Sequence, residues 1–120
     1  MQIRVYYEDT DVGGVVYYAN YLKFCERARS ELFFQKGLSP HQDDQFFVVK
    51  SVKAEYIKSA VFGDLLTIDT KLTQKKSASI VMYQSIKRDD EVLFTGEFKL
   101  AYLKNFKPCK IPSELFEVFN

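Results

Sequence analysis

Histidine is almost absent from this chain of 120 residues: His41 is the only one, and it lies in a polar stretch after Pro40. A Ser-His-Asp or Cys-His catalytic site would have to use it, and no nucleophile-elbow motif accompanies it. No glycine-rich phosphate-binding loop occurs either. The sequence therefore argues against hydrolases of the triad type and against nucleotide hydrolysis.

Cysteine is also scarce, and the two that occur, Cys25 and Cys109, lie far apart. This spacing fits neither a disulfide framework nor a zinc site, so we expect two reduced, unpaired thiols and no metal. No apolar run approaches twenty residues and no basic-then-apolar leader begins the chain, which predicts a cytoplasmic protein without membrane insertion. The net charge of +1 and the lack of a long basic run disfavour nucleic-acid binding.

What the chain has in quantity is apolar and aromatic side chains. Hydrophobic residues make up 47% and charged residues 28%, which is typical of a globular protein. The length predicts a single domain over residues 1–120. Eleven Phe and eight Tyr are more than so small a domain easily hides, so we expect some of them to contact a partner chain.

The apolar pattern predicts one long helix among β-strands. Between Tyr18 and Lys36 apolar residues recur at helical spacing, and Gly37 and Pro40 follow where a helix would end. The final IPSELFEVF predicts a short helical turn capped by Ser113. Alternating apolar residues predict five strands, the last two joined as a hairpin by the polar turn KRDDE: Gln2–Glu8, Phe46–Ile57, Leu65–Leu72, Ala78–Lys87 and Val92–Leu103. This order favours an α+β fold in which an antiparallel sheet wraps around the helix.

The segment DTDVGG places two acids, Asp9 and Asp11, and two glycines, Gly13 and Gly14, ahead of the predicted helix. It lacks the later ligands of a calcium loop. An Asp-rich connecting turn explains it without any function, because Asp and Gly are common turn residues. The helix start offers a second explanation, since its free N–H groups and dipole can stabilise the oxyanion of an attacked acyl group. A carboxylate opposite it would attack the carbonyl or deprotonate water, which predicts an acyl-transfer site.

The stretch YYEDTDVGGVVYYANYLKFCERARSE, residues 6–31, resembles the signature of the hotdog-fold 4-hydroxybenzoyl-CoA thioesterase family. Within that family it is most similar to the acyl-CoA thioesterases associated with the bacterial Tol-Pal system. AEYIKSAVFGDLLTI and IPSELF extend the resemblance over nearly the whole chain. The resemblance implies a hotdog fold, in which one long central helix is wrapped by a five-stranded antiparallel sheet. It also implies hydrolysis of an acyl-CoA thioester to free acid and CoA, without a metal or an organic cofactor.

The resemblance also assigns roles to individual residues. It implies that Asp11 is catalytic, as nucleophile or general base, and that Tyr18 supplies an oxyanion-binding N–H from its main chain. Asp9 would hold the turn. The substrate-binding residues that it implies are Gly13, Gly14, Asn20 and Tyr21. This sequence departs from the pattern at two positions: the Tol-Pal-associated members usually carry His in place of Tyr18, and the middle motif usually has Pro in place of Ser59.

The resemblance further implies a homo-oligomer, a tetramer built from dimers, with Phe46–Ile57 at the seam between two subunits and the acyl channel between them. The implied substrate carrier is CoA, with acyl-carrier protein as the alternative. Three basic segments either contact the CoA phosphates or are solvated turns, namely Gln74–Lys76, Lys87–Arg88 and Lys104–Lys110. The charged residues of the helix are expected at the surface or in subunit ion pairs: Glu26, Arg27, Arg29 and Glu31.

Two other functions stay open at the level of sequence. Hotdog dehydratases depend on a His/Glu pair, and the only histidine of this chain lies outside the matching segment. The other alternative is a non-catalytic acyl-thioester-binding or scaffold protein of the cell-envelope machinery. The presence of both acids and both glycines disfavours it, and an assay of thiol release from acyl-CoAs distinguishes it from an enzyme.

Overall fold

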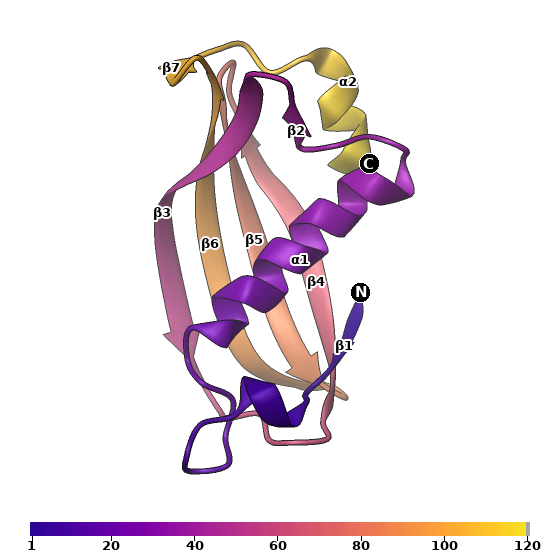
Figure 1. Cartoon of the computed structure of the whole chain (residues 1–120), viewed down its shortest axis with the longest axis vertical. Coiled ribbons are helices and arrows are strands. Elements are labelled where there is room, and N and C mark those ends of the chain that lie inside the picture. Colours follow the sequence, from indigo (N-terminus) through magenta and orange to yellow (C-terminus); the bar gives the residue numbers. More distant parts are fainter. Residues whose placement is uncertain (120) are drawn as a thin grey trace.

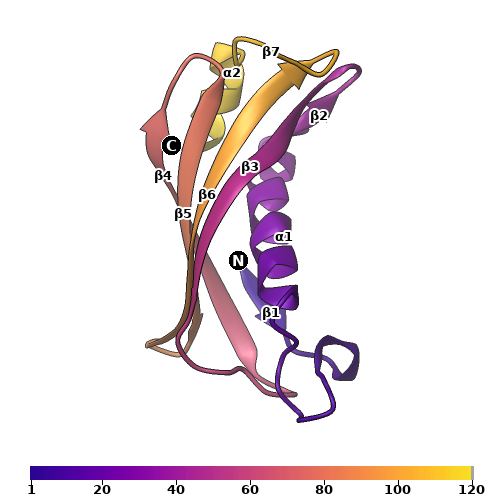
Figure 2. The same cartoon turned by 90° about the vertical axis from the view of Figure 1, so that its left-hand side faces the viewer.

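The computed structural model describes residues 1–119 and consists of one long helix against a curved antiparallel sheet (Figure 1). The long helix is α1 (Asn20–Gln35); near the C-terminus the short helix α2 (Ser113–Phe116) precedes a 3₁₀ turn. The strands are β1 (Gln2–Arg4), β2 (His41–Gln42), β3 (Gln45–Tyr56), β4 (Leu65–Lys75), β5 (Ser79–Arg88), β6 (Glu91–Lys104) and β7 (Lys107–Pro108). The view in Figure 2 shows the sheet curving along one side of α1.

The strands follow the order β1-β4-β5-β6-β3-β2, with β7 paired to the end of β6, and all pairings are antiparallel. β5 and β6 form the predicted hairpin. The α+β hotdog fold is therefore confirmed, with the short strands β2 and β7 in addition to the five strands expected. β3 is paired along its length with β6, whereas β2 covers only Gln45 and Phe46 on the other side. Within residues 1–119, most of the outer edge of β3 is unpaired.

The first strand is shorter than the sequence suggests. β1 ends at Arg4, and a 3₁₀ turn covers Tyr7–Asp9, so the predicted strand Gln2–Glu8 is wrong beyond Arg4. The cause is local, because the Asp9 carboxylate accepts a hydrogen bond from the Tyr6 N–H at 2.9 Å. The N–H of Asp9 in turn donates to the Tyr6 carbonyl at 3.0 Å. These two bonds close a turn where the apolar pattern alone would continue the strand.

The helix ends differ in how well the sequence predicts them. Gly37 has a φ of 72° just after α1, and the N–H of Leu38 donates to the Phe33 carbonyl at 2.9 Å. This is the left-handed glycine termination that the sequence predicts. Ser113 is not a cap: it is the first residue of α2, Pro112 occupies the cap position, and no side chain bonds to this helix end. The predicted Ser113 cap is therefore wrong.

The face of α1 that packs on the sheet is mostly apolar, as its spacing predicts. Its buried apolar residues are Tyr21, Phe24, Cys25, Ala28 and Phe33. Burial raises the pKa of the Cys25 thiol to about 12, although nearby Arg29 acts in the opposite direction, so this thiol is neutral at physiological pH. Both cysteines are unpaired, as expected. No helix among residues 1–119 has the length and apolarity that crossing a membrane requires.

One charged residue lies on this apolar face. Arg29 is only 8% exposed, and its Nη1 donates to the Gln84 Oε1 at 2.8 Å. Its guanidinium carbon lies 4.5 Å from the centre of the Phe98 ring. The predicted surface position is therefore wrong for Arg29. Arg29 lies four residues after Cys25 and four before Phe33, which places it on the buried face of the helix. This spacing in the sequence indicates that Arg29 is buried.

Parts of the basic segments contact groups within the chain. Lys87 Nζ lies 3.4 Å from an Asp69 carboxylate oxygen, and Arg88 is paired with two carboxylates. Lys75 Nζ lies 4.2 Å from the centre of the Phe116 ring. At Lys87 and Arg88 these contacts favour an internal structural role over the binding of CoA phosphates.

Candidate active site

Asp9 fixes the acidic turn to the start of α1. The residue is buried, and its carboxylate binds the Tyr6 N–H as described above. Its backbone carbonyl accepts two further hydrogen bonds, from the Asn20 Nδ2 at 3.0 Å and from the Tyr17 N–H at 2.9 Å. Because these donors come from the helix start, the turn and the helix are held in one fixed arrangement.

Asp11 lies at the exposed tip of this turn. Its Oδ1 accepts the Gly13 N–H at 2.8 Å, and its backbone carbonyl accepts the Gly14 N–H at 3.0 Å. Gly14 has a φ of 80°, which other residues rarely adopt, and a side chain at Gly13 would place its Cβ 3.3 Å from the Asp11 Oδ1. Within the described chain the other carboxylate oxygen, Oδ2, has no hydrogen-bond donor. Asp11 is therefore oriented through one oxygen and free to react through the other.

A cleft of about 310 Å³ lies between this acid and the start of α1. Asp11 and Tyr18 both line it, so the structure brings together the two residues that the sequence predicts to be catalytic. The other lining residues are Val15, Val16, Tyr17, Tyr21, Tyr56, Ile57, Lys58 and Ser59. A second hollow, lined by Tyr7, Thr10, Asp11, Val12, Gly14 and Phe62, lies on the other side of the turn.

The backbone at the helix start has unused hydrogen-bond donors. The Tyr17 carbonyl accepts the Asn20 N–H at 2.8 Å, so the chain already turns ahead of the first residue of α1. Within residues 1–119 no acceptor binds the N–H of Tyr18 or of Ala19. Free N–H groups at a helix start carry partial positive charge and favour anions. The Tyr18 N–H at the cleft is therefore suited to bind an oxyanion.

Aromatic rings line the cleft on the side of the core. Tyr21 is buried and stacks on Phe94, with ring centres 5.4 Å apart, and its hydroxyl accepts the Ala60 N–H at 3.0 Å. Tyr56 packs edge-on against Tyr21 at 5.6 Å and against Tyr18 at 6.1 Å. Partial burial, with smaller effects of Tyr18, Tyr21 and Cys25, raises the pKa of Tyr56 above its ordinary value. An apolar group bound in the cleft would contact these rings.

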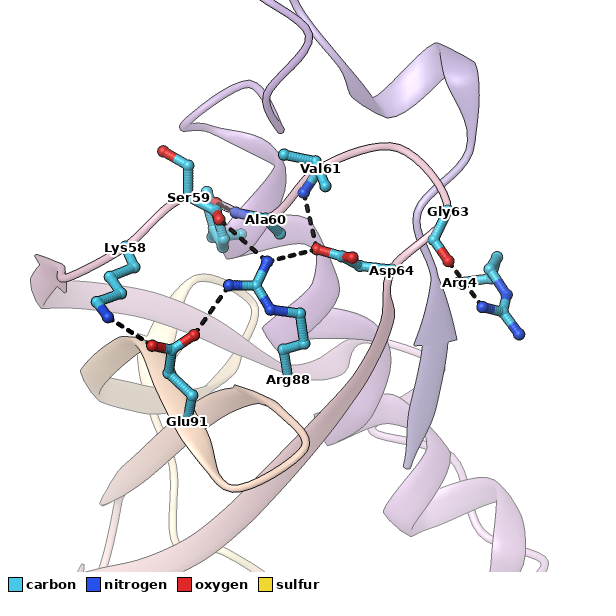
Figure 3. A network of polar contacts seen from close by, with 10 residues as sticks. Arg4, Lys58, Ser59, Ala60, Val61, Gly63, Asp64, Arg88 and Glu91 are labelled. Carbon is cyan, nitrogen blue, oxygen red and sulfur yellow. Dashed lines mark hydrogen bonds and ion pairs between the residues drawn. The ribbon is translucent and has the colours of Figure 1, made fainter.

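The loop between β3 and β4 forms the opposite wall and is held by ion pairs (Figure 3). Arg88 donates to Asp64 at 2.8 Å and to Glu91 at 2.9 Å, and Lys58 pairs with Glu91 at 2.6 Å. Asp64 also accepts the Val61 N–H at 2.9 Å, which closes the loop. The wall is thereby attached to the turn between β5 and β6.

Replacing Arg88 by methionine is expected to lower the melting temperature by a few degrees at pH 7, and by less at a pH below the folded-state pKa of Glu91. Lys58 and Arg88 hold the pKa of Glu91 below its ordinary value of 4.5. A carboxylate with a lowered folded-state pKa stabilises the fold above its unfolded pKa, and this stabilisation is lost as the pH falls through the folded pKa. Melting curves of both proteins at the two pH values measure the effect. An equal difference at both values would contradict the network.

The predicted substrate-binding residues divide into two groups. Tyr21 lines the cleft between Asp11 and Tyr18, and Gly14 lines the hollow on the other side of the turn. Gly13 contributes its N–H to the Asp11 carboxylate, and Asn20 contributes its amide to the turn. These two residues therefore orient the turn.

Sequence reasoning did not identify Tyr56 as part of the cleft, and His41 and Glu31 lie away from it. Tyr56 stands at the end of β3 in an ordinary strand pattern, so only the fold brings it to the helix start. His41 and Glu31 line separate hollows elsewhere along the helix. His41 does line one cavity together with Glu26, but within residues 1–119 no ion pair joins these two side chains.

Known proteins resemble this chain over nearly its whole length. The sequence profile of the thioesterase superfamily matches residues 13–95. The "Acyl-CoA thioesterase YbgC" of Helicobacter pylori (strain J99) is 48% identical over 100% of this chain and 98% of that protein. The "Acyl-CoA thioester hydrolase YbgC" of Escherichia coli O6:H1 is 42% identical over 98% of this chain and 92% of that protein. The crystal structure of a probable thioesterase from Bartonella henselae, 34% identical, matches with a TM-score of 0.88 over 93% of this chain and 97% of the other.

Proposed function

The chain belongs to the thioesterase superfamily, and on that premise we propose that the cleft between Asp11 and the start of α1 hydrolyses an acyl-CoA thioester to free acid and CoA. Full-length relatives that are named for this reaction support the proposal. The observation that carries it is the geometry of the cleft. Asp11, whose carboxylate has a free oxygen, and Tyr18, whose backbone N–H has no acceptor among residues 1–119, both line the same hollow.

Asp11 acts on the carbonyl carbon of the thioester in one of two ways. As a nucleophile its oxygen bonds to that carbon, the carbon–sulfur bond breaks, and CoA leaves as a thiolate that takes up a proton. Water then hydrolyses the resulting mixed anhydride. As a general base Asp11 takes a proton from a water molecule whose oxygen attacks the carbonyl, and the leaving sulfur is protonated in turn. Both routes use the free carboxylate oxygen.

The helix start stabilises the negative charge that develops on the carbonyl oxygen. The donor in this proposal is the main-chain N–H of Tyr18, and the α1 dipole adds to its effect. The tyrosine side chain is not required for this role. Tyr21 and Tyr56 contact the acyl group, Gly14 lets the ligand approach the backbone, and Gly13 and Asn20 keep the turn in place.

Purified protein is expected to release free thiol from acyl-CoA, and the release is followed with a thiol reagent across acetyl-, octanoyl-, palmitoyl- and benzoyl-CoA. Acyl-carrier protein thioesters of the same acyl groups test the alternative carrier. Release from at least one thioester supports the enzyme. Binding of these thioesters without any release would instead favour the non-catalytic acyl-binding function.

A homo-oligomer is part of the proposal, with β3 of two copies pairing edge to edge. The unpaired outer edge of β3 within the described chain supports it, because bare strand edges readily pair with another chain. The exposed apolar residues along this segment also support it: Val49, Val52, Tyr56 and Ile57. Since Tyr56 also lines the cleft, the seam would adjoin the active site. Two such dimers would form a tetramer.

We also propose that the protein is located in the cytoplasm.

Replacing Val52 by lysine is expected to shift the protein toward monomer and to lower its activity at least tenfold. The added charge would have to be buried at the seam, which is costly. Analytical ultracentrifugation and thiol release measure the two effects. Phe34→Lys, at an exposed position on α1, is the matched control and should change neither. A wild-type protein that is monomeric and fully active would contradict the shared-seam proposal.

A further inference from the structure

A second cavity, of about 300 Å³, lies between the C-terminal half of α1 and the inner face of the sheet. It shares no lining residue with the cleft at Asp11. Arg29 lines it, nine residues after the start of α1, which corresponds to about 14 Å along the helix. The catalytic proposal gives this cavity no role.

The buried guanidinium of Arg29 is incompletely paired. Arginine has five N–H donors, and among residues 1–119 the structure gives this one a single hydrogen-bond partner, the amide oxygen of Gln84. No carboxylate of the described chain lies within ion-pair distance. Burying a charge without a counter-charge is costly, and burial lowers the pKa of Arg29 while Cys25 and Glu26 oppose that shift. Among residues 1–119 no fully buried side-chain nitrogen or oxygen lacks a hydrogen-bond partner, so the remaining N–H groups of Arg29 reach accessible space. An anionic ligand in the cavity could accept hydrogen bonds from them.

The rest of the cavity is mainly apolar. Phe33, Phe47, Ile80, Met82 and Leu100 line it together with Arg29, and Ser30 and His41 are its other polar residues besides Glu26. The cavity has the volume of about ten water molecules at roughly 30 Å³ each. An eight-carbon carboxylic acid has a similar number of non-hydrogen atoms, so it would about fill the cavity. Glu26 also lines the cavity, from an exposed position one turn earlier on the helix. A ligand suited to this site is therefore an apolar chain that ends in a carboxylate.

We infer that the cavity is a binding site for an aliphatic carboxylate, in which Arg29 pairs with the carboxylate and the chain lies against Phe33, Phe47 and Met82. Two sources share this chemistry. One is the free acid that hydrolysis releases, a source that rests on the proposed function. The other is the far carboxylate of a dicarboxylic acyl group. The planar guanidinium forms two parallel hydrogen bonds with a carboxylate, which an alcohol of equal length cannot reproduce.

Octanoate binding to the purified protein, measured by calorimetry and by NMR shifts of the Arg29 side-chain N–H, tests this inference. Octanoate is not a thioester, so the result does not depend on whether the protein hydrolyses one. Octan-1-ol should bind at least tenfold more weakly. Arg29→Gln should weaken octanoate binding at least tenfold, Arg29→Lys should retain part of it, and Glu26→Gln, which removes a nearby negative charge, should strengthen it.

Ser30→Leu keeps the arginine and fills part of the cavity, so it should also weaken octanoate binding if Arg29→Gln fails to fold. The source is distinguished by kinetics. If the site serves a dicarboxylic acyl group, octanedioyl-CoA should have a lower KM than octanoyl-CoA, and Arg29→Lys should reduce that preference; otherwise the free acid is the ligand. Equal binding of octanoate and octanol, or octanoate shifts confined to the cleft at Asp11, would overturn the inference.

Discussion

Replacing Asp11 by asparagine is expected to lower kcat for acyl-CoA hydrolysis by about 10²–10⁴-fold, the usual contribution of a positioned acid or base. Asparagine keeps the shape of the side chain and an oxygen that can accept the Gly13 N–H, so the turn should be preserved. What is lost is the negative charge and the free carboxylate oxygen. Thiol release measures the rate, and melting curves should coincide with those of the wild type.

The matched control for Asp11→Asn is Asp89→Asn. Asp89 is also exposed, and it lies in the turn between β5 and β6 with a φ of 54°, a conformation that asparagine tolerates. The Asp89→Asn substitution removes one negative charge at a position outside the cleft, so kcat should be unchanged. An Asp11→Asn protein that hydrolyses acyl-CoA at the wild-type rate would exclude Asp11 as nucleophile and as base.

Replacing Tyr18 by proline is expected to lower kcat by about 10²–10³-fold, which corresponds to about 2.7–4 kcal/mol for the loss of one oxyanion donor. Proline has no N–H, and the first turn of a helix tolerates it because that N–H has no partner within the helix. Tyr18 lies two residues before α1, and its N–H likewise has no acceptor among residues 1–119. The fold should therefore survive, as melting curves and circular dichroism can verify.

Tyr18→Phe provides the comparison, because it keeps the main-chain N–H and the ring and removes only the hydroxyl. Its kcat should stay within a few-fold of the wild type. If Tyr18→Phe were as damaging as Tyr18→Pro, the hydroxyl and not the backbone would carry the function. If Tyr18→Pro were folded and fully active, the oxyanion donor would lie elsewhere.

The main elements of the fold were predictable because their periodicity is strong. The helix between Tyr18 and Lys36 and the four long strands lie within a few residues of α1 and of β3 to β6. The errors occur where local backbone geometry differs from what the pattern indicates. Asp9 closes a turn on Tyr6 and ends the first strand, and Pro112 displaces Ser113 from the cap of α2.

The candidate site was predictable only in its sequence-local part. Asp11 and Tyr18 are seven residues apart, and the glycine turn and the helix start nearly determine their proximity. Tyr56 reaches the same cleft from the end of β3, and nothing in its own strand pattern indicates that contact. Arg29 was assigned to the surface because charged residues usually lie there, although its helical spacing indicates the buried face.

A crystal structure with a dethia analogue of octanoyl-CoA, in which a methylene replaces the sulfur and the carbonyl is kept, tests the central claim most directly. We predict the carbonyl oxygen about 2.7–3.1 Å from the Tyr18 backbone nitrogen. The Asp11 carboxylate should lie about 3–3.5 Å from the carbonyl carbon or from a water beside it. A bound analogue whose carbonyl contacts neither residue, in any subunit arrangement, would contradict the claim.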